Sequence, residues 1–135
     1  MTQPEQQSDG RRISVLVIDD EQTVRRALSR LLGRMGFTVY LADSGSAALT
    51  AYAEKPGSID YVLLDHTMPD MDGSETFRRL RALDPAAKVI LSSGYGRSEE
   101  IEELLRCGAL AFVQKPFEMR TLLAHLPQAA ADRAD

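Results

Sequence analysis

Residues 13–20 read ISVLVIDD, an almost continuous apolar run that two aspartates end abruptly. A β-branched run without polar alternation predicts a strand that is buried on both faces. Strands of this kind are typical of parallel sheets, in which a crossover connection joins each strand to the next. Apolar residues at helical spacing follow over residues 24–35, and Gly36 ends the predicted helix. This part of the chain therefore predicts a strand followed by a crossover helix.

The same alternation continues to the end of the apolar sequence. We predict strands at residues 13–18, 37–41, 61–64, 88–92 and 110–114, and helices at residues 24–35, 44–54, 74–83, 98–107 and 119–126. Five strands alternating with five helices predict a doubly wound α/β fold, a five-stranded parallel sheet with helices on both faces. One domain is expected at residues 13–126, between a flexible polar lead at 1–12 and a tail at 127–135.

Composition narrows the class of protein. The 135 residues have a net charge of −4 with both signs mixed, which argues against direct binding to nucleic acid. The lead lacks the apolar stretch of a secretory signal, and no apolar run is long enough to cross a bilayer, so we expect a cytoplasmic protein without membrane insertion. The single cysteine, Cys107, lies in an apolar-periodic stretch and is predicted to be a buried small hydrophobe.

Polar residues stand at the carboxyl ends of four predicted strands. Asp19 and Asp20 follow the first, Asp65 the third, Ser93 the fourth and Lys115 the fifth. In open α/β sheets, ligand sites form at this edge. We therefore expect three carboxylates, a hydroxyl and an ammonium to converge on one small area.

Each of these residues also has a simpler interpretation. One of Asp19 and Asp20 fits a helix cap, although adjacent acids beside a buried strand also favour a divalent cation such as Mg²⁺. Asp65 fits an ordinary turn, or a nucleophile that forms an acyl phosphate. Ser93 fits a hydroxyl without function at a strand end. Lys115 fits a surface lysine, except that a cis bond before Pro116 would fix its direction. Their joint placement favours phosphoryl transfer.

Four motifs resemble the receiver (response regulator) domains of bacterial two-component systems. They lie in the family's order and at its spacing, and the match runs from about residue 13 to residue 126. The motifs are VIDDE at 17–21, LLDHTMPDMDG at 63–73, LSSG at 91–94 and KPF at 115–117. The resemblance implies a flavodoxin-like strand order of 2-1-3-4-5.

The resemblance also implies a role for each matching position. Asp65 would be the phosphoacceptor, and Lys115 would pair with the phosphoryl group. Asp20, Asp65 and the backbone carbonyl of Thr67 would bind Mg²⁺ directly, while Asp19 would act largely through water. Ser93 matches the switch hydroxyl.

Three further positions are implied by the family. Phe112 stands where receivers carry an aromatic switch residue, and it also fits a plain core aromatic. Thr67 and Tyr95 occupy the positions that flank the phosphoryl group and influence how long it lasts.

In this resemblance the donor is a histidine kinase or a histidine phosphotransfer protein. The phosphorylated chain would switch the surface formed by residues 98–107, 110–114 and 119–126 and contact a downstream protein there. A second copy of the phosphorylated chain is a further candidate partner. A receiver is not an enzyme, because it catalyses only its own phosphorylation and dephosphorylation. A stand-alone receiver and a receiver of a hybrid histidine kinase, to which residues 91–95 are similar, both stay open.

Two other classes of protein share parts of this pattern. A haloacid dehalogenase-type phosphatase also uses an aspartate with Mg²⁺, but it carries the nucleophile after its first strand in an Asp-x-Asp pattern, whereas the first predicted strand here ends in the adjacent acids Asp19 and Asp20. A flavodoxin-like nucleotide- or flavin-binding domain would need a phosphate loop where this chain has Asp19, Asp20 and Glu21.

Overall fold

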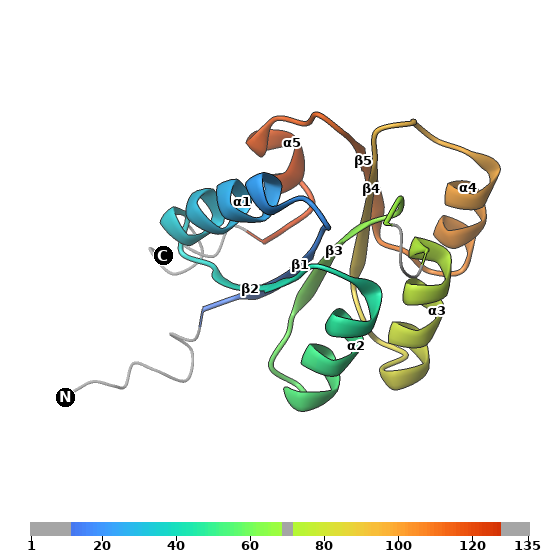
Figure 1. The fold of residues 1–135 in the computed structure, drawn as a ribbon, viewed down its shortest axis with the longest axis horizontal. Helices are drawn as coiled ribbons and strands as arrows, with labels where there is room; N and C mark the ends of the chain where they lie inside the picture. The colour runs from blue at the N-terminus through green and yellow to red at the C-terminus, as the bar shows by residue number, and fades with distance from the viewer. Residues whose placement is uncertain (1–11, 69–71, 128–135) are drawn as a thin grey trace.

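A computed structural model of the chain describes residues 12–68 and 72–127. Most of the predicted lead and tail, and the centre of the predicted loop at 68–73, lie outside these residues. Strands and helices alternate along the described parts (Figure 1): β1 (Ser14–Ile18), α1 (Gln22–Arg34), β2 (Thr38–Ala42), α2 (Gly45–Glu54), β3 (Tyr61–Asp65), α3 (Gly73–Leu83), β4 (Val89–Ser93), α4 (Glu99–Arg106), β5 (Ala111–Gln114) and α5 (Met119–Leu123).

The strands form one parallel sheet in the order β2-β1-β3-β4-β5. Every pairing is parallel, and the register places Ile18 beside Leu64 and Asp65 beside Ser92. The predicted α/β fold and its strand order are therefore confirmed. The order reverses between β1 and β3, which is where a doubly wound sheet opens a crevice at its carboxyl edge.

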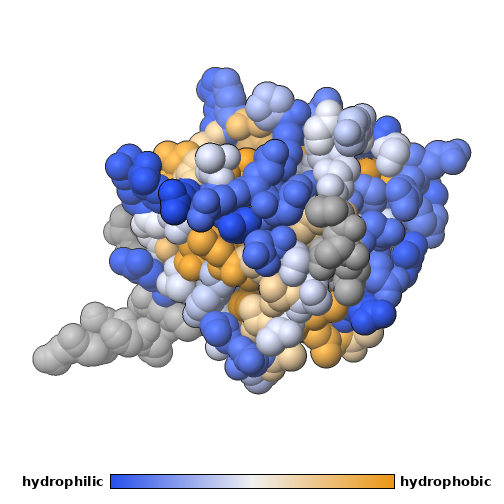
Figure 2. Space-filling view, viewed as in Figure 1, coloured by the Kyte–Doolittle hydropathy of each residue, from blue (hydrophilic) through white to orange (hydrophobic). Residues whose placement is uncertain are grey.

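Helices cover both faces of the sheet (Figure 1), with α2, α3 and α4 on one side and α1 and α5 on the other. Neighbouring residues of a strand enter opposite layers: Leu16 and Ile18 pack under α2–α4, and Val15 and Val17 pack under α1 and α5. This double burial explains why β1 is apolar without alternation. On the face shown in Figure 2, hydrophilic residues surround the hydrophobic patches.

Short polar residues begin three of the helices. Ser44, Asp72 and Ser98 each accept a hydrogen bond from the backbone N–H three residues later, which caps α2, α3 and α4. Gly36 follows α1 with a φ of 97°, a left-handed conformation that a glycine adopts without strain. Local sequence thus sets where these elements start and stop.

Two predictions differ from the structure. The last helix is shorter than residues 119–126, because the backbone beyond Leu123 continues with bonds from His125 to Leu122 and from Leu126 to Leu123. Cys107 is exposed, and the prediction that it is buried was wrong. It follows the last residue of α4, where the chain turns away from the buried face that carries Ile101 and Leu104.

None of the helices in the described part of the chain has both the length and the apolar character needed to cross a membrane.

Candidate functional site

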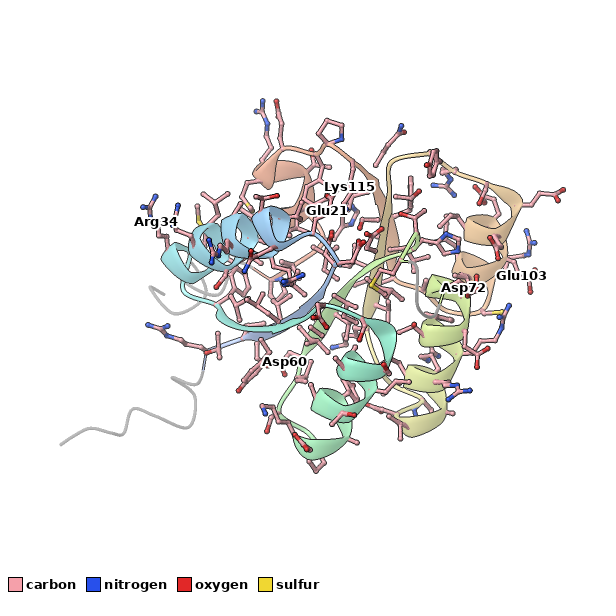
Figure 3. The ribbon with its side chains drawn as sticks, viewed as in Figure 1. Glu21, Arg34, Asp60, Asp72, Glu103 and Lys115 are labelled. Atoms are coloured by element: carbon pink, nitrogen blue, oxygen red, sulfur yellow. The ribbon has the colours of Figure 1, made fainter. Side chains whose placement is uncertain are left out.

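The predicted polar residues meet at the carboxyl edge of the sheet. Asp19 follows β1, Asp65 ends β3, Ser93 ends β4, and Lys115 follows β5. These four strands are neighbours in the sheet, so the parallel topology alone brings their ends together. Figure 3 shows Lys115 at this edge, on the side of α1 and α5, whereas Asp60 lies at the opposite end of the strands.

The carboxylates of Asp19, Asp20 and Asp65 form a compact cluster. Each offers an oxygen, and these oxygens all lie within 4.8 Å of one another. Asp19 and Asp65 are only 2% and 3% exposed, whereas Asp20 is exposed. The interpretation that one of these aspartates caps the first helix is wrong: Asp19 Oδ1 accepts a hydrogen bond at 3.0 Å from the backbone N–H of Glu21, which precedes α1, and no side chain among the described residues caps this helix.

Lys115 provides a positive charge between the two buried acids. Its Nζ lies 2.6 Å from Asp19 Oδ2 and 3.4 Å from Asp65 Oδ2. Burial disfavours the charged ammonium, but the hydrogen bond to Asp19 and the negative charges of Asp65 and Asp19 outweigh it, so the pKa of Lys115 is raised. The Lys115–Pro116 peptide bond is cis. Lys115 is therefore held in the cluster and is not a freely solvated surface lysine.

Thr67 fixes the carboxylate of Asp65 from the other side. Its backbone N–H and its hydroxyl both donate to Asp65 Oδ1, at 3.1 and 3.0 Å. One oxygen of Asp65 is thus held by Thr67, and the other faces Lys115. The carboxylate has a defined orientation at the end of β3.

The donor set fits a hard divalent cation. Three carboxylates face one ammonium, so this group of four side chains keeps two negative charges without a partner. All of the candidate ligands are oxygen atoms, which Mg²⁺ prefers, and Mg²⁺ needs only one or two carboxylates beside its waters. The exposure of Asp20 leaves the cluster open on one side.

The remaining predicted residues surround this cluster at different depths. Ser93 is 2% exposed, and its Oγ accepts a hydrogen bond from the Tyr95 backbone N–H at 3.1 Å, which leaves its O–H free to donate. Tyr95 itself is 87% exposed. Phe112 is half-buried against the layer of α2–α4. Among the described residues, the side chains of Tyr95 and Phe112 have no polar contact with the carboxylates.

Two contacts at this edge have no counterpart in the sequence-based prediction. Arg25 donates from Nη1 to the backbone carbonyl of Asp19 at 2.8 Å. The ring of His66 lies next to Ser74 and Glu100, which belong to α3 and α4. The sequence places Arg25 on the first predicted helix and His66 directly after Asp65. Neither position tells which residue the side chain contacts.

Comparisons with known proteins agree with this geometry. A family model described as the response regulator receiver domain matches residues 15–127. The chain is 39% identical over 108 residues to the regulatory protein AtoC of Escherichia coli K12. The aligned region covers 80% of this chain and 23% of AtoC. It is 36% identical over 120 residues to the chemotaxis protein CheY of Listeria monocytogenes. This alignment covers 87% of this chain and 98% of CheY.

A solved structure described as the CheX-CheY-BeF3-Mg complex from Borrelia burgdorferi matches with a TM-score of 0.80 and 30% identity, over 84% of this chain and 86% of that one. The chain spans about a quarter of the length of AtoC, but it spans nearly all of the Listeria CheY. With a family match across most of its length, the chain belongs to the response regulator receiver domains, the phosphoacceptor signalling domains of two-component systems.

Proposed function

We propose that this chain accepts a phosphoryl group from a phosphohistidine onto Asp65, and that residues 13–126 form the receiver domain that does so in the cytoplasm. The observation that carries the proposal is the state of the Asp65 carboxylate. It is 3% exposed, Thr67 holds one of its oxygens, and Lys115 lies 3.4 Å from the other. A carboxylate held in this way is oriented for attack on phosphorus.

In the proposed reaction an oxygen of Asp65 attacks the phosphorus atom of the phosphohistidine. A P–O bond forms and the P–N bond breaks, and the leaving imidazole nitrogen keeps the electron pair and takes a proton from solvent. Lys115 would neutralise charge on the transferred group, and the free O–H of Ser93 would donate to one of its oxygens. The chain thus catalyses only its own phosphorylation and dephosphorylation.

Mg²⁺ is the proposed cofactor. We assign Asp20, Asp65 and the Thr67 backbone carbonyl as ligands, with Asp19 acting largely through water. When bound, the ion supplies neutralisation of the negative charge that gathers on the phosphoryl oxygens. The uncompensated charge of the carboxylate cluster supports this assignment, as does the Mg named with the Borrelia CheY complex.

The donor is proposed to be a histidine kinase or a histidine phosphotransfer protein. An apolar groove of about 530 Å³ lies between α1 and the segment after β5, next to the site, and it is lined by Val24, Leu28, Leu31, Phe117 and Met119 among others. Lys115 lines the groove and also contacts Asp65, so a protein seated there lies beside the phosphoacceptor. Hydrophobic surface gathers in this region in Figure 2.

Output is proposed to pass through the surface of α4, β5 and α5. The phosphoryl group would draw Ser93 inward, Phe112 would move toward the space left, and a downstream protein or a second copy would bind the altered surface. Thr67 and Tyr95 would tune the lifetime of the phosphoryl group. Both a stand-alone receiver and the receiver of a hybrid histidine kinase fit this proposal.

Mass spectrometry of the intact chain tests the acceptor. Incubation with acetyl phosphate and Mg²⁺ is expected to add one phosphoryl group to the wild type and none to Asp65→Asn. Asp43→Asn is the matched control, since Asp43 is an exposed aspartate just beyond β2 at the same edge of the sheet. A phosphoryl gain that persists in Asp65→Asn would refute the assignment.

The proposal that the phosphodonor protein binds the apolar groove is tested by Leu31→Asp. Leu31 lines the groove and is 38% exposed, so the variant places a charge on the groove surface. Transfer from a phosphorylated kinase should slow by about tenfold or more, while labelling by acetyl phosphate stays unchanged. Leu83→Asp, at a 53% exposed leucine on α3, serves as the control. If Leu31→Asp slowed phosphorylation by the kinase and by acetyl phosphate equally, the variant would have damaged the site itself, and this result would refute a docking role for the groove.

A further inference from the structure

His66 connects the loop after Asp65 to two helices. Its side chain is 11% exposed, and its Nε2 lies 3.1 Å from Ser74 Oγ on α3 and 3.6 Å from Glu100 Oε1 on α4. Ser74 Oγ in turn lies 3.3 Å from Glu100 Oε2. The three side chains therefore join β3, α3 and the first turn of α4. We call His66, Ser74 and Glu100 the latch.

The donors and acceptors of the latch can all be matched. A carboxylate only accepts, so the single hydrogen of the Ser74 hydroxyl points to Glu100. The Ser74 oxygen then accepts from His66, which requires the proton on Nε2. The result is a continuous chain of hydrogen bonds from Nε2 of His66 through the Ser74 hydroxyl to the Glu100 carboxylate.

The backbone of His66 is tied to β4 and to the start of α3. Its N–H donates to the Ser92 carbonyl of β4 at 2.8 Å, and its carbonyl accepts from the Gly73 N–H at 3.1 Å. A methyl group added at Gly73 would lie 2.5 Å from the Cα of His66, so α3 is packed directly against it. The far end of the latch is less enclosed, because the Glu100 side chain is 60% exposed whereas that of His66 is 11% exposed.

We propose that the latch is a positioning device that holds the first turn of α4 against α3 and the Asp65 loop while the acceptor is unphosphorylated. This inference rests on the proposed phosphorylation of Asp65 and names the contact that opposes the switch. Moving the start of α4 away breaks the bonds at Glu100, so the latch favours the resting arrangement. Its removal should make the switched state easier to reach.

The single cysteine of the chain makes the test direct. Cys107 is exposed and directly follows α4, so a trifluoromethyl probe on its thiol reports the environment of that helix by fluorine NMR. The labelled full chain is titrated with beryllium fluoride in the presence of Mg²⁺. Ser74→Ala removes the hydroxyl that contacts both His66 and Glu100, and Glu100→Ala removes the carboxylate at the end of the latch. Glu99→Ala is the control, because no contact joins Glu99 to His66 in the described residues.

Both latch variants are expected to reach half-conversion at a beryllium fluoride concentration about twofold to tenfold lower than the wild type, the range for losing one hydrogen bond. The control should titrate like the wild type. His66→Gln, which keeps a side-chain N–H donor, should lie closer to the wild type than His66→Leu. A variant that merely loosens the fold would lower stability without this directed shift.

Hydrogen exchange without beryllium fluoride gives a second readout. The amides of Ile101 and Glu102, which bond to Ser98 in the first turn of α4, should exchange faster in the latch variants than in the Glu99→Ala control. Unchanged exchange and unchanged titration would overturn the latch, as would a shift to higher concentrations. A wild type that does not respond to beryllium fluoride at all would overturn the proposed function and the latch with it.

Discussion

Replacing Lys115 with methionine tests the charge balance of the site. The change keeps an unbranched side chain one atom shorter than lysine and leaves Asp19 and Asp65, which are 2% and 3% exposed, without their cation. Removing one partner of a buried ion pair costs about 3–5 kcal/mol. The Lys115 side chain is itself 21% exposed, so water screens part of the pair. We therefore expect a loss of about 2–3 kcal/mol in the free energy of unfolding.

Urea unfolding measures this loss under two conditions. In EDTA the full difference between Lys115→Met and the wild type is expected. In excess Mg²⁺ the difference should shrink, because carboxylates without the competing ammonium bind the cation more tightly, and a ligand of the folded chain stabilises it by mass action. Labelling of Lys115→Met by acetyl phosphate should still be slow in saturating Mg²⁺, since the variant lacks the ammonium proposed to meet the phosphoryl group.

Lys88→Met is the matched control for this experiment. Lys88 is an exposed lysine just before β4, with its ammonium 5.3 Å from the ring centre of Tyr61 and far from the carboxylates. Its loss should cost about 1 kcal/mol or less and should not depend on Mg²⁺. Equal stability of Lys115→Met and the wild type in EDTA would refute the reasoning, because it would mean that the buried acids do not need the ammonium.

Two further changes test the packing and the electrostatics around the site. Gly73→Ala should lower stability by about 1–3 kcal/mol in urea unfolding, because the new methyl meets stiff backbone 2.5 Å away at His66; an unchanged midpoint would contradict that contact. Tyr52→Phe removes the 2.6 Å hydrogen bond to Asp84 and should cost about 1 kcal/mol at neutral pH. Burial and this bond raise the pKa of Tyr52, and the bond lowers the pKa of Asp84. The stabilisation by Tyr52 should therefore be complete below its ordinary pKa of 10.0 and fade as the pH rises above it, while that by Asp84 should fade as the pH falls through its lowered pKa. In plots of unfolding free energy against pH, the variant should lose the decline at high pH and should keep only part of the decline at low pH, since the backbone N–H of Ala86 also lowers the pKa of Asp84. Plots for variant and wild type that run parallel would contradict the assignment.

The fold was predictable because each element carries its own signal. The apolar run at β1 is unbroken since both faces of the strand are buried, and Ser44 and Ser98 stand where α2 and α4 begin. The errors lie where those signals end. Cys107 follows α4 by one residue, and periodicity cannot tell a helical residue from the one that leaves the helix.

The carboxylate cluster was predictable for a different reason. A parallel sheet aligns the carboxyl ends of its strands, so residues that end or follow β1, β3 and β5 can be expected to meet before any side-chain direction is known. No topological rule of this kind predicts the latch. His66, Ser74 and Glu100 come from a loop and two helices, and their contact depends on how α3 and α4 pack on each other. Sequence spacing carries no information on that packing.

The cluster itself is better explained by chemistry than by stability. β1 and β3 are among the most deeply buried strands, and each is followed or ended by an acid with almost no exposed surface. Buried ion pairs are weak evidence for stability, because the cost of removing charges from water can exceed the attraction between them. A third acid, Asp20, adds repulsion that Lys115 alone does not cancel. A fold selected for stability alone would do better with neutral side chains at these positions. The excess negative charge at the end of the sheet is what a site for a cation and a phosphoryl group requires.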